Sequence, residues 1–414
     1  MTFCEAMNSD EFSEVHVKIV FLAPFGLRPK GTVIARMVPL AAELTGLGCN
    51  VTIIAPPYTN PADAGTMETV RGVTVKNIPL GPFTGTAAAP VLAWRLFRSA
   101  LAEKPDLIHL FKPKGYAGMA AMLQIACAAL GMKMPWLFVD TDDLEGKGGM
   151  NELREYSAAE KSFFAFQEQW LPRRALGVTA ASRALTELIY GMGLDRDRVL
   201  YLPNCVDDLP PGNGQMVRKR LGIAPEVPVL LLYTRFFEFS QEKLHRICTE
   251  VYRRVPALQI LVVGQGRQGE EDLLLQAARA GGFSGSLRMA GWVDPEHLPD
   301  YLAAANVALY PFSDTPVNRA KCPAKLTELL RAGIPVVADR VGQIPEYLAP
   351  EMHSLLCSPD DPDEMAAKCA DLLLNADRRR EVSSALQSYI MLNYNWRRYA
   401  KLLYEFYRRR ITAL

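Results

Sequence analysis

The chain has 414 residues, more than one ordinary hydrophobic core holds, so two domains are expected. Its 46 Lys and Arg residues nearly balance 45 Asp and Glu residues, and a net charge of +1 argues against nucleic-acid binding through a broad basic surface. The eight cysteines are scattered singly, without Cys-x-x-Cys pairs, which argues against a disulfide scaffold or a zinc site and favours reduced thiols in the cytoplasm.

Neither the beginning of the chain nor its longest apolar run predicts export or a membrane span. Residues 1–14 carry acids and no apolar segment, so they are expected to form a flexible lead rather than a signal peptide. The apolar run at residues 117–132 is shorter than the roughly 20 residues that a span needs, and Gln124 interrupts it. A core helix is therefore predicted there.

Residues 15–211 alternate short β-branched segments with helical patterns, which is typical of a parallel sheet. An amphipathic helix is expected from about residue 33, a second near residues 157–174, and Ser182 is expected to cap a third. Strands are predicted at residues 17–23, 50–56, 106–111, 135–140, 175–182 and 199–204. This part is expected to form an N-terminal Rossmann-like domain.

Prolines and glycines near residue 212 indicate a domain boundary, after which a second series of strands and helices begins. Strands are predicted at residues 227–233, 258–264, 286–291, 306–312, 334–339 and 353–357. Residues 212–390 would thus form a second Rossmann-like domain, with the ligand-binding ends of the two sheets facing across a cleft.

Residues 391–414 predict a basic amphipathic helix at the end of the chain. Such a helix could pack back on the N-terminal domain and clamp the two domains together, or lie on an anionic membrane surface. Both alternatives stay open from the sequence.

The segment Gly264-x-Gly266-x-x-Gly269 formally matches a dinucleotide-binding fingerprint between a strand and a helix. The next predicted strand, however, has no Asp or Glu at its end to hold a ribose, which argues against NAD. Gly264 and Gly266 are instead predicted to form a tight turn that lets the backbone approach a ligand.

Six segments together resemble, in order and spacing, the retaining, nucleotide-sugar-dependent glycosyltransferases of group 1. The resemblance implies the GT-B fold, an α/β architecture of two Rossmann-like domains with parallel sheets. Residues 15–211 would then bind the acceptor and residues 212–390 the nucleotide-sugar donor. It also implies metal-independent sugar transfer, with retention, from a nucleoside-diphosphate sugar to a hydroxyl acceptor in glycan or glycolipid biosynthesis, and no cofactor beyond this donor. The segments are FLAPFGLRPKGTVIARMVPLAAELTGLGCNVTIIAP, RVLYLPNCVD, LLLYTRFFEF, ILVVGQG, MAGWVDPEHLPDYLAAANVALYPF and CPAKLTELLRAGIPVVADRVGQIPEYL.

Three residues are predicted to act directly on the donor. Lys325 lies in the first turn of a helix, where its charge and the helix dipole would both act on phosphate. Glu328 lies on the same helical face at i+3, resembles the final glutamate of the family motif, and could accept ribose hydroxyls. Arg235 matches the family arginine that neutralises the leaving diphosphate. The alternatives are a solvated lysine, a Glu328–Lys325 pair and a structural salt bridge at Arg235.

Further residues are assigned to the donor side by their positions in the resemblance. Lys243 follows Arg235 at a longer spacing than the family lysine does, so Lys325 or Lys321 could share its role. Trp292 and Val293 stand where the family meets the nucleobase, and a buried packing tryptophan is the alternative. Gly31, in the loop after the first strand, is also assigned to the donor side, and so are Gly264 and Gly266.

The chain departs from the family pattern at two places. Ala320 stands where the family carries an earlier acid, and Asp314 is the residue that could replace that acid. In the segment LFVDTDDLEG, Asp140, Asp142 and Asp143 stand where a histidine is frequent. Asp142 is predicted to be catalytic and the other two to contact the acceptor; turn or helix caps are the alternative, and no metal is expected.

Lys112 and Lys114, together with Arg28 and Lys30, follow predicted strands of the first domain. They are expected to border the cleft and to receive an anionic acceptor, although loop lysines are more often only solvated.

A nucleotide-sugar epimerase of the same fold, an NAD-dependent oxidoreductase and a non-catalytic GT-B binding protein are the alternative functions. The expected partners are the nucleotide sugar and a glycan or lipid-linked acceptor. The expected location is the cytoplasm, with peripheral contact at the inner face of the membrane as an option.

Overall fold

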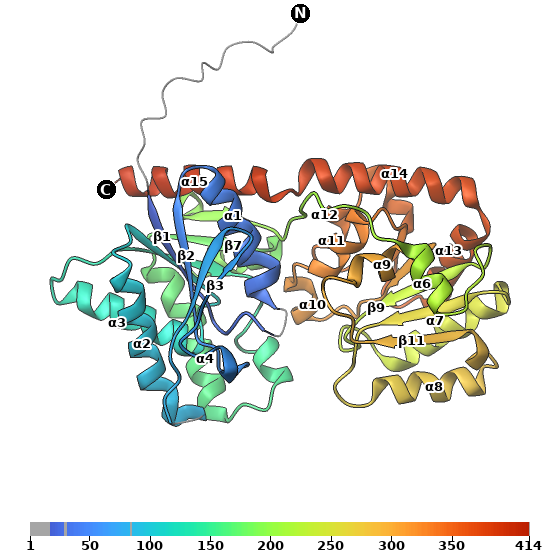
Figure 1. Cartoon of the computed structure of the whole chain (residues 1–414), viewed down its shortest axis with the longest axis horizontal. Coiled ribbons are helices and arrows are strands. Elements are labelled where there is room, and N and C mark those ends of the chain that lie inside the picture. The colour runs from blue at the N-terminus through green and yellow to red at the C-terminus, as the bar shows by residue number, and fades with distance from the viewer. Residues whose placement is uncertain (1–16, 29–30, 83–84, 414) are drawn as a thin grey trace, which may run out of the picture. The chain divides into compact units, whose positions relative to one another are not determined.

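A computed structural model describes residues 17–28, 31–82 and 85–413, and the predicted lead at residues 1–14 lies outside them. The chain forms two compact units (Figure 1). The first comprises the chain up to Asp140, Phe164–Thr179 and Ala400–Leu414, and the second comprises Thr141–Phe163 and Ala180–Tyr399. This division follows spatial contacts, whereas the predicted boundary near residue 212 follows the order of elements along the chain.

The first sheet is mainly parallel and has the strand order β3-β4-β2-β1-β5-β6-β7-β8, in which β8 is Val199–Tyr201. The sequence did not predict the antiparallel β3–β4 hairpin, whose two-residue turn has positive φ at both Arg71 and Gly72. The strands are β1 (Lys18–Leu22), β2 (Asn50–Ala55), β3 (Met67–Val70), β4 (Val73–Asn77), β5 (Leu107–Phe111), β6 (Trp136–Thr141) and β7 (Gly177–Ala180).

Helices flank this sheet, and Figure 1 shows α2 and α3 packed beside each other. The helix that begins at Val33 opens with five residues of π-helix before it becomes α-helical, a distortion frequent near functional sites. The helices are η1 (Val33–Met37), α1 (Val38–Gly46), η2 (Pro61–Asp63), η3 (Gly85–Ala88), α2 (Ala89–Ala102), α3 (Gly115–Ala129) and α4 (Ala158–Arg174).

A buried polar network crosses the core of the first unit. The Arg36 guanidinium donates to both carboxylate oxygens of Asp140, at 2.9 and 2.6 Å. Thr179 Oγ1 donates to Asp140 and lies 3.2 Å from His109 Nε2, while His109 Nδ1 bonds the Tyr407 hydroxyl at 2.5 Å. Burial lowers the pKa of His109 to about 4, so the folded protein keeps this imidazole neutral.

This network corrects the prediction that Asp140 contacts the acceptor. The Asp140 side chain is fully buried and bonded to Arg36 and Thr179, because β6 carries it into the core beside η1 and β7. Its role is structural.

The second unit contains a fully parallel sheet with the order β11-β10-β9-β12-β13-β14. Its strands alternate with helices, as predicted, and Ser182 caps α5 by accepting a hydrogen bond from the Leu185 amide at 3.2 Å. The strands of this sheet are β9 (Val229–Tyr233), β10 (Gln259–Val263), β11 (Leu287–Gly291), β12 (Val307–Tyr310), β13 (Val336–Asp339) and β14 (Leu356–Cys357).

The remaining helices include long ones that cover the second sheet and short ones in its loops. Across the described ranges, no helix is long and apolar enough to cross a membrane. They are η4 (Met150–Leu153), α5 (Arg183–Gly191), η5 (Arg196–Arg198), α6 (Gly214–Arg220), α7 (Gln241–Arg254), α8 (Glu270–Ala280), η6 (Ser284–Ser286), α9 (Leu298–Ala303), α10 (Pro316–Ala320), α11 (Ala324–Arg331), α12 (Ile344–Tyr347), η7 (Pro350–Leu355), α13 (Pro362–Leu374) and α14 (Ala376–Asn393).

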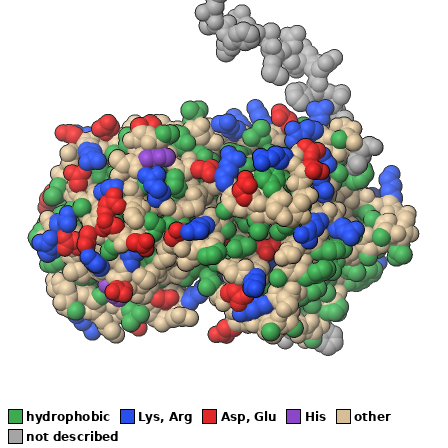
Figure 2. Space-filling view, turned by 180° about the vertical axis from the view of Figure 1, so that it is seen from behind, with side chains coloured by type: hydrophobic (Ala, Val, Ile, Leu, Met, Phe, Trp, Pro, Cys, Tyr) green, Lys and Arg blue, Asp and Glu red, His purple; other side chains and the backbone are tan. Residues whose placement is uncertain are grey.

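The C-terminal helix α15 (Trp396–Thr412) is amphipathic, as predicted. Leu403, Phe406 and Tyr407 are buried, and the Phe406 and Tyr407 rings contact Phe138 of β6 in the first unit. Its apolar face is therefore covered by protein and is not available to lie on a membrane. The exposed residues of the helix are largely basic, although acidic and basic side chains are intermingled on the face of the molecule in Figure 2.

Candidate functional site

The site in the second unit lies where the strand order of its sheet reverses. From β9 the chain builds β10 and β11 on one side and then β12, β13 and β14 on the other. In such sheets, ligands bind outside the carboxyl ends of the strands at this switch point. Arg235 follows β9, and Asp314 follows β12, so the fold brings two predicted donor residues to this edge.

Arg235 is an exposed cation at a constrained turn. Phe236 adopts the left-handed conformation with φ of 65°, which is costly for a bulky residue, and its amide donates to Thr234 Oγ1 at 2.8 Å. The Arg235 guanidinium lies 5.1 Å from the ring centre of Phe237. Within the described residues Arg235 forms no salt bridge, so the structural alternative is not what the structure shows.

Two more cations contact the same Phe237 ring. Lys321 Nζ lies 3.9 Å from the ring centre and the Arg267 guanidinium 5.2 Å from it. Lys321 is buried and pairs with Glu238 at 3.2 Å, and burial lowers its pKa. We call Arg235, Arg267 and Lys321 the Phe237 cation cluster. Sequence reasoning missed Arg267 and Phe237, although the aromatic pair in TRFFEF and the arginine within the glycine loop were visible signals.

Lys325 and Glu328 lie together beside β9, as their i+3 spacing predicts. The Tyr233 hydroxyl donates to Glu328 Oε2 at 2.9 Å, and Lys325 Nζ lies 4.3 Å from the centre of the Tyr233 ring. Burial raises the pKa of Tyr233, and so does the neighbouring Glu328 carboxylate. Lys325 is half-buried, so it is more than a solvated lysine. Tyr233, which orients Glu328, was not predicted.

Lys243 does not belong to this group. Its Nζ lies 2.5 Å from Asp339 Oδ2 and 2.7 Å from the Pro359 carbonyl, and its side chain is 9% exposed. The pairing arises because α7 begins after Ser240 and points its first turn toward the end of β13. Burial raises the pKa of Asp339 to about 6, while Lys243 opposes that rise. The predicted donor role of Lys243 is replaced by a structural one.

The glycine loop after β10 bonds to its own helix. The Gly266 amide donates to Glu271 Oε1 at 2.7 Å, and the Gln268 amide donates to Glu270 Oε2 at 2.7 Å. These amides are the groups that a dinucleotide pyrophosphate would need, so the arrangement argues against NAD. Gly264 is required for packing, because its φ is 120° and a Cβ would lie 1.9 Å from the Thr234 carbonyl oxygen.

Three other predicted donor positions lie at the ends of β11 and β12. Trp292 is 52% exposed, so the alternative of a buried packing tryptophan is wrong, and Val293 is half-buried beside it. Both oxygens of Asp314 bond the exposed Arg319 side chain, at 2.5 and 2.7 Å. This bidentate pair lowers the pKa of Asp314 and occupies the carboxylate that would replace the missing acid at Ala320.

Most of the predicted acceptor-side cations of the first unit are buried or contact other side chains of the protein. Lys112 is buried and has a positive φ just after β5, and its amide donates to the Asp140 carbonyl of β6 at 3.1 Å. Lys114 is half-buried, with Nζ 5.7 Å from the Phe164 ring centre. Arg28 is paired with Asp63 and Glu68, and Lys30 lies outside the described residues.

The other predicted residues stand at unit ends or helix starts. Gly31 is half-buried in the first unit, and its carbonyl accepts from the Ala35 amide at 2.9 Å as η1 begins. Asp142 and Asp143 are half-buried in the second unit, and Asp143 acts electrostatically on Lys321. The roles predicted for these three residues stay predictions.

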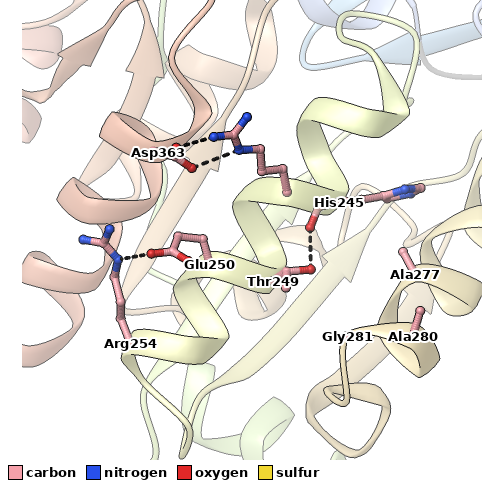
Figure 3. A pocket seen from close by; sticks show the side chains of 9 residues that line it. His245, Thr249, Glu250, Arg254, Ala277, Ala280, Gly281 and Asp363 are labelled. Atoms are coloured by element: carbon pink, nitrogen blue, oxygen red, sulfur yellow. Dashed lines mark hydrogen bonds and ion pairs between the residues drawn. The ribbon is translucent and has the colours of Figure 1, made fainter.

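A pocket of about 680 Å³ lies elsewhere on the second unit, between α7 and α8 (Figure 3). Ion pairs line it, since Arg246 bonds Asp363 and Arg254 lies 2.8 Å from Glu250. None of the predicted site residues is among its described lining residues. Its internally balanced charges give it no evident ligand, whereas a smaller pocket includes Tyr233 and Lys325 of the site.

Solved structures with the same architecture show the fold class of the chain. The chain is similar to sucrose-phosphate synthase from Thermosynechococcus elongatus (18% identity, TM-score 0.74), covering 96% of this chain and 100% of that one. It is also similar to Anabaena HepE in complex with UDP and glucose (18%, TM-score 0.69), over 96% of this chain and 100% of that one. These identities show the fold alone, which is the predicted GT-B fold with two parallel α/β domains.

Two sequence families match the chain. Residues 31–205 match the family described as Glycosyl transferase 4-like domain, and residues 228–375 match Glycosyl transferases group 1. The chain belongs to the group 1 glycosyltransferases, as its motifs predicted.

Curated relatives are glycosyltransferases with different acceptors in their names. The chain is 25% identical to a D-inositol 3-phosphate glycosyltransferase from Rhodococcus erythropolis, over 94% of this chain and 88% of the relative. It is 25% identical to a GDP-mannose-dependent alpha-(1-6)-phosphatidylinositol monomannoside mannosyltransferase from Mycobacterium tuberculosis, over 50% of this chain and 55% of the relative. These names describe the relatives.

Proposed function

We propose that the protein transfers a sugar from a nucleoside-diphosphate sugar to a hydroxyl acceptor and retains the anomeric configuration. The Phe237 cation cluster carries this proposal, because three cations meet around one ring at the switch point of the second sheet. Lys325 and the Tyr233-bonded Glu328 lie at the same strand ends. The cations match the anionic diphosphate of such a donor, and Glu328 matches the hydroxyl groups of its ribose.

The proposed chemistry rests on charge that develops as the sugar leaves. The diphosphate gains negative charge when its bond to the anomeric carbon breaks, and fixed cations stabilise that charge without reorganising. Arg235 and Lys325 would bind the phosphates, while Glu328 would accept hydrogen bonds from ribose hydroxyls. The leaving phosphate oxygen would take the acceptor proton on the face from which the sugar departs, which gives retention.

Names of similar proteins support the donor class. One similar structure is a complex with UDP and glucose, another is a starch synthase domain from Arabidopsis thaliana bound to ADP and acarbose, and one relative is named GDP-mannose-dependent. The base and the sugar differ among them, so the class shared by the three is a nucleotide with a phosphate chain.

Donor binding can be tested by thermal unfolding of the full chain with UDP, GDP, ADP and NAD. We expect one nucleoside diphosphate to raise the unfolding temperature, since a ligand at 100 times its Kd stabilises by roughly 2.7 kcal/mol. NAD should leave it unchanged. Glu328→Ala should weaken nucleotide binding roughly 10- to 100-fold, because charge-assisted hydrogen bonds to the ribose are lost. Glu351→Ala, an exposed glutamate on η7, is the control. Stabilisation by NAD alone would contradict the proposal.

Donor binding does not test whether the sugar is transferred or whether its anomeric configuration is retained, so the reaction product must be analysed. Proton NMR of the glycoside formed should show the anomeric configuration of the donor. Epimerised or merely hydrolysed donor, with no glycoside from any hydroxyl acceptor, would favour an epimerase of this fold.

We propose cytoplasmic action with peripheral contact at an anionic membrane surface. The exposed side of α15 supports the contact, because Lys401, Arg408 and Arg409 are exposed and the apolar side is buried. Such residues attract anionic lipids with about 1 kcal/mol each near the surface. The protein should sediment with phosphatidylserine vesicles and not with phosphatidylcholine vesicles, and the K401E/R408E/R409E variant should stay in the supernatant. Equal recovery with both lipids would contradict the contact.

A further inference from the structure

The first unit has a switch point of its own, and two aromatic side chains lie beside it. From β1 the chain builds β2, β4 and β3 on one side, and then β5, β6 and β7 on the other. The order β2-β1-β5 therefore marks the place where a ligand of this sheet binds, outside the carboxyl ends of the strands. Under the proposed function, this ligand is the acceptor.

Two tyrosines flank this position. Tyr58 follows the end of β2 by three residues, and Tyr116 lies in the first turn of α3, just after β5. Their ring centres are 5.3 Å apart with an interplanar angle of 86°, an edge-to-face pair. Tyr58 is 42% exposed, and the half-buried Tyr116 donates its hydroxyl to the Gly85 carbonyl at 3.1 Å. The Tyr58 ring is thus held against a fixed neighbour while part of it faces solvent.

The loops that carry the pair are tied together. The Thr59 hydroxyl donates to the Arg28 carbonyl at 2.6 Å, which joins the loop after β2 to the loop after β1. A Cβ at Gly26 would lie only 3.0 Å from the Pro57 Cα, so the two backbones are in close contact. A surface fixed in this way loses little entropy when it binds a ligand.

Two of the described cations near the pair, Arg28 and Lys112, do not favour an anion. Arg28 NH1 lies 2.9 Å from Asp63 and its NH2 lies 2.7 Å from Glu68, so two carboxylates neutralise it. Lys112 is buried. The anionic acceptor that the sequence predicted on these cations therefore lacks support from Arg28 and Lys112, and an uncharged ligand fits the surface better.

We propose that Tyr58 and Tyr116 form a stacking platform for a neutral pyranose ring of the acceptor, which makes the acceptor a carbohydrate. One face of a pyranose carries mostly C–H groups, which pack on the electron-rich face of an aromatic ring. The sugar hydroxyls at the ring edge stay solvated or reach toward the donor. This inference rests on the proposed glycosyl transfer and adds the class of acceptor to it.

Saturation-transfer NMR with the full chain tests the platform directly. The probes are the methyl α-glycosides of glucose, mannose, galactose and N-acetylglucosamine, with glycerol and inositol 1-phosphate as the uncharged non-pyranose and anionic comparisons. We expect at least one methyl glycoside to be saturated through the protons of its C–H face. Tyr58→Ala should abolish that signal, whereas Tyr58→Phe, which keeps the ring, should retain it. Trp136→Ala removes another ring that is 42% exposed, at the amino end of β6, and should change nothing.

Kinetics with the glycoside that binds give a second readout. Tyr58→Ala should raise the acceptor KM roughly tenfold, as expected for loss of one apolar contact face, while kcat and the donor KM stay unchanged. Saturation of none of the four glycosides, saturation of inositol 1-phosphate alone, or an unaltered glycoside signal in Tyr58→Ala would each overturn the platform. Nucleotide stabilisation of the same Tyr58→Ala protein tells the failures apart: if it persists, only the platform is wrong, and if even the unmodified chain binds no nucleotide, the proposed function is wrong.

Discussion

Arg235→Ala should lower kcat roughly 100- to 1000-fold, because a preorganised charge aimed at the leaving group usually contributes this much. Arg235 is exposed at the end of β9 and lies against Phe237, so its removal leaves the core intact. The loss should appear in kcat at saturating donor, measured with the nucleotide sugar that stabilises the protein most. Arg235→Lys should recover only part of the rate, since an ammonium cannot bind two phosphate oxygens with the planar fork of arginine.

The matched control is Arg279→Ala, which removes an exposed arginine from the last turn of α8. Its kcat should equal that of the unmodified chain. If Arg235→Ala kept full kcat and only raised the donor KM, Arg235 would bind the donor equally in the ground state and the transition state. It would then not specifically stabilise the departing diphosphate.

Asp140→Ala should cost roughly 3–5 kcal/mol of unfolding free energy, because it leaves the buried Arg36 charge without its partner. The side chains of both residues are at most 1% exposed, so water cannot replace the missing carboxylate. Urea unfolding followed by intrinsic fluorescence measures the loss. A double substitution, R36M/D140L, should recover much of the stability, since removing both charges leaves no unpaired ion.

The same comparison can contradict the assignment of Asp140 as structural. If Asp140→Ala unfolded at the same urea concentration as the unmodified chain and lost only activity, the predicted acceptor role would return. The buried position and the bonds to Arg36 and Thr179 predict the opposite pattern.

The sequence predicted those features that depend on neighbours along the chain. The β-branched segments became the strands of two parallel sheets, and Ser182 became a helix cap, because these are set by local periodicity and turn chemistry. Lys325 and Glu328 share a helical face for the same reason. The hairpin turn at Arg71 and Gly72 has a local signal too, but its strands of four and five residues were not predicted.

Long-range pairings were beyond sequence reasoning. Lys243 and Asp339 are 96 residues apart, and Arg36 and Asp140 are 104 apart, so nothing local marks either pair as structural. The cluster around Phe237 likewise draws Arg267 and Lys321 from separate loops. A charged residue at a strand end can face a ligand or a buried partner, and only the packed structure separates the two.

The most direct test of glycosyl transfer from a nucleotide donor is acceptor-dependent release of nucleoside diphosphate. The full chain would be incubated with UDP-, GDP- and ADP-sugars, with and without methyl glycosides, and the released diphosphate and any glycoside would be quantified together. We predict that one donor yields diphosphate and an anomerically retained glycoside in equal amounts, and that Arg235→Ala suppresses both. Two results would contradict the account. One is release of nucleoside diphosphate at the same rate with and without acceptor, and the other is no release from any donor while NAD stabilises the protein.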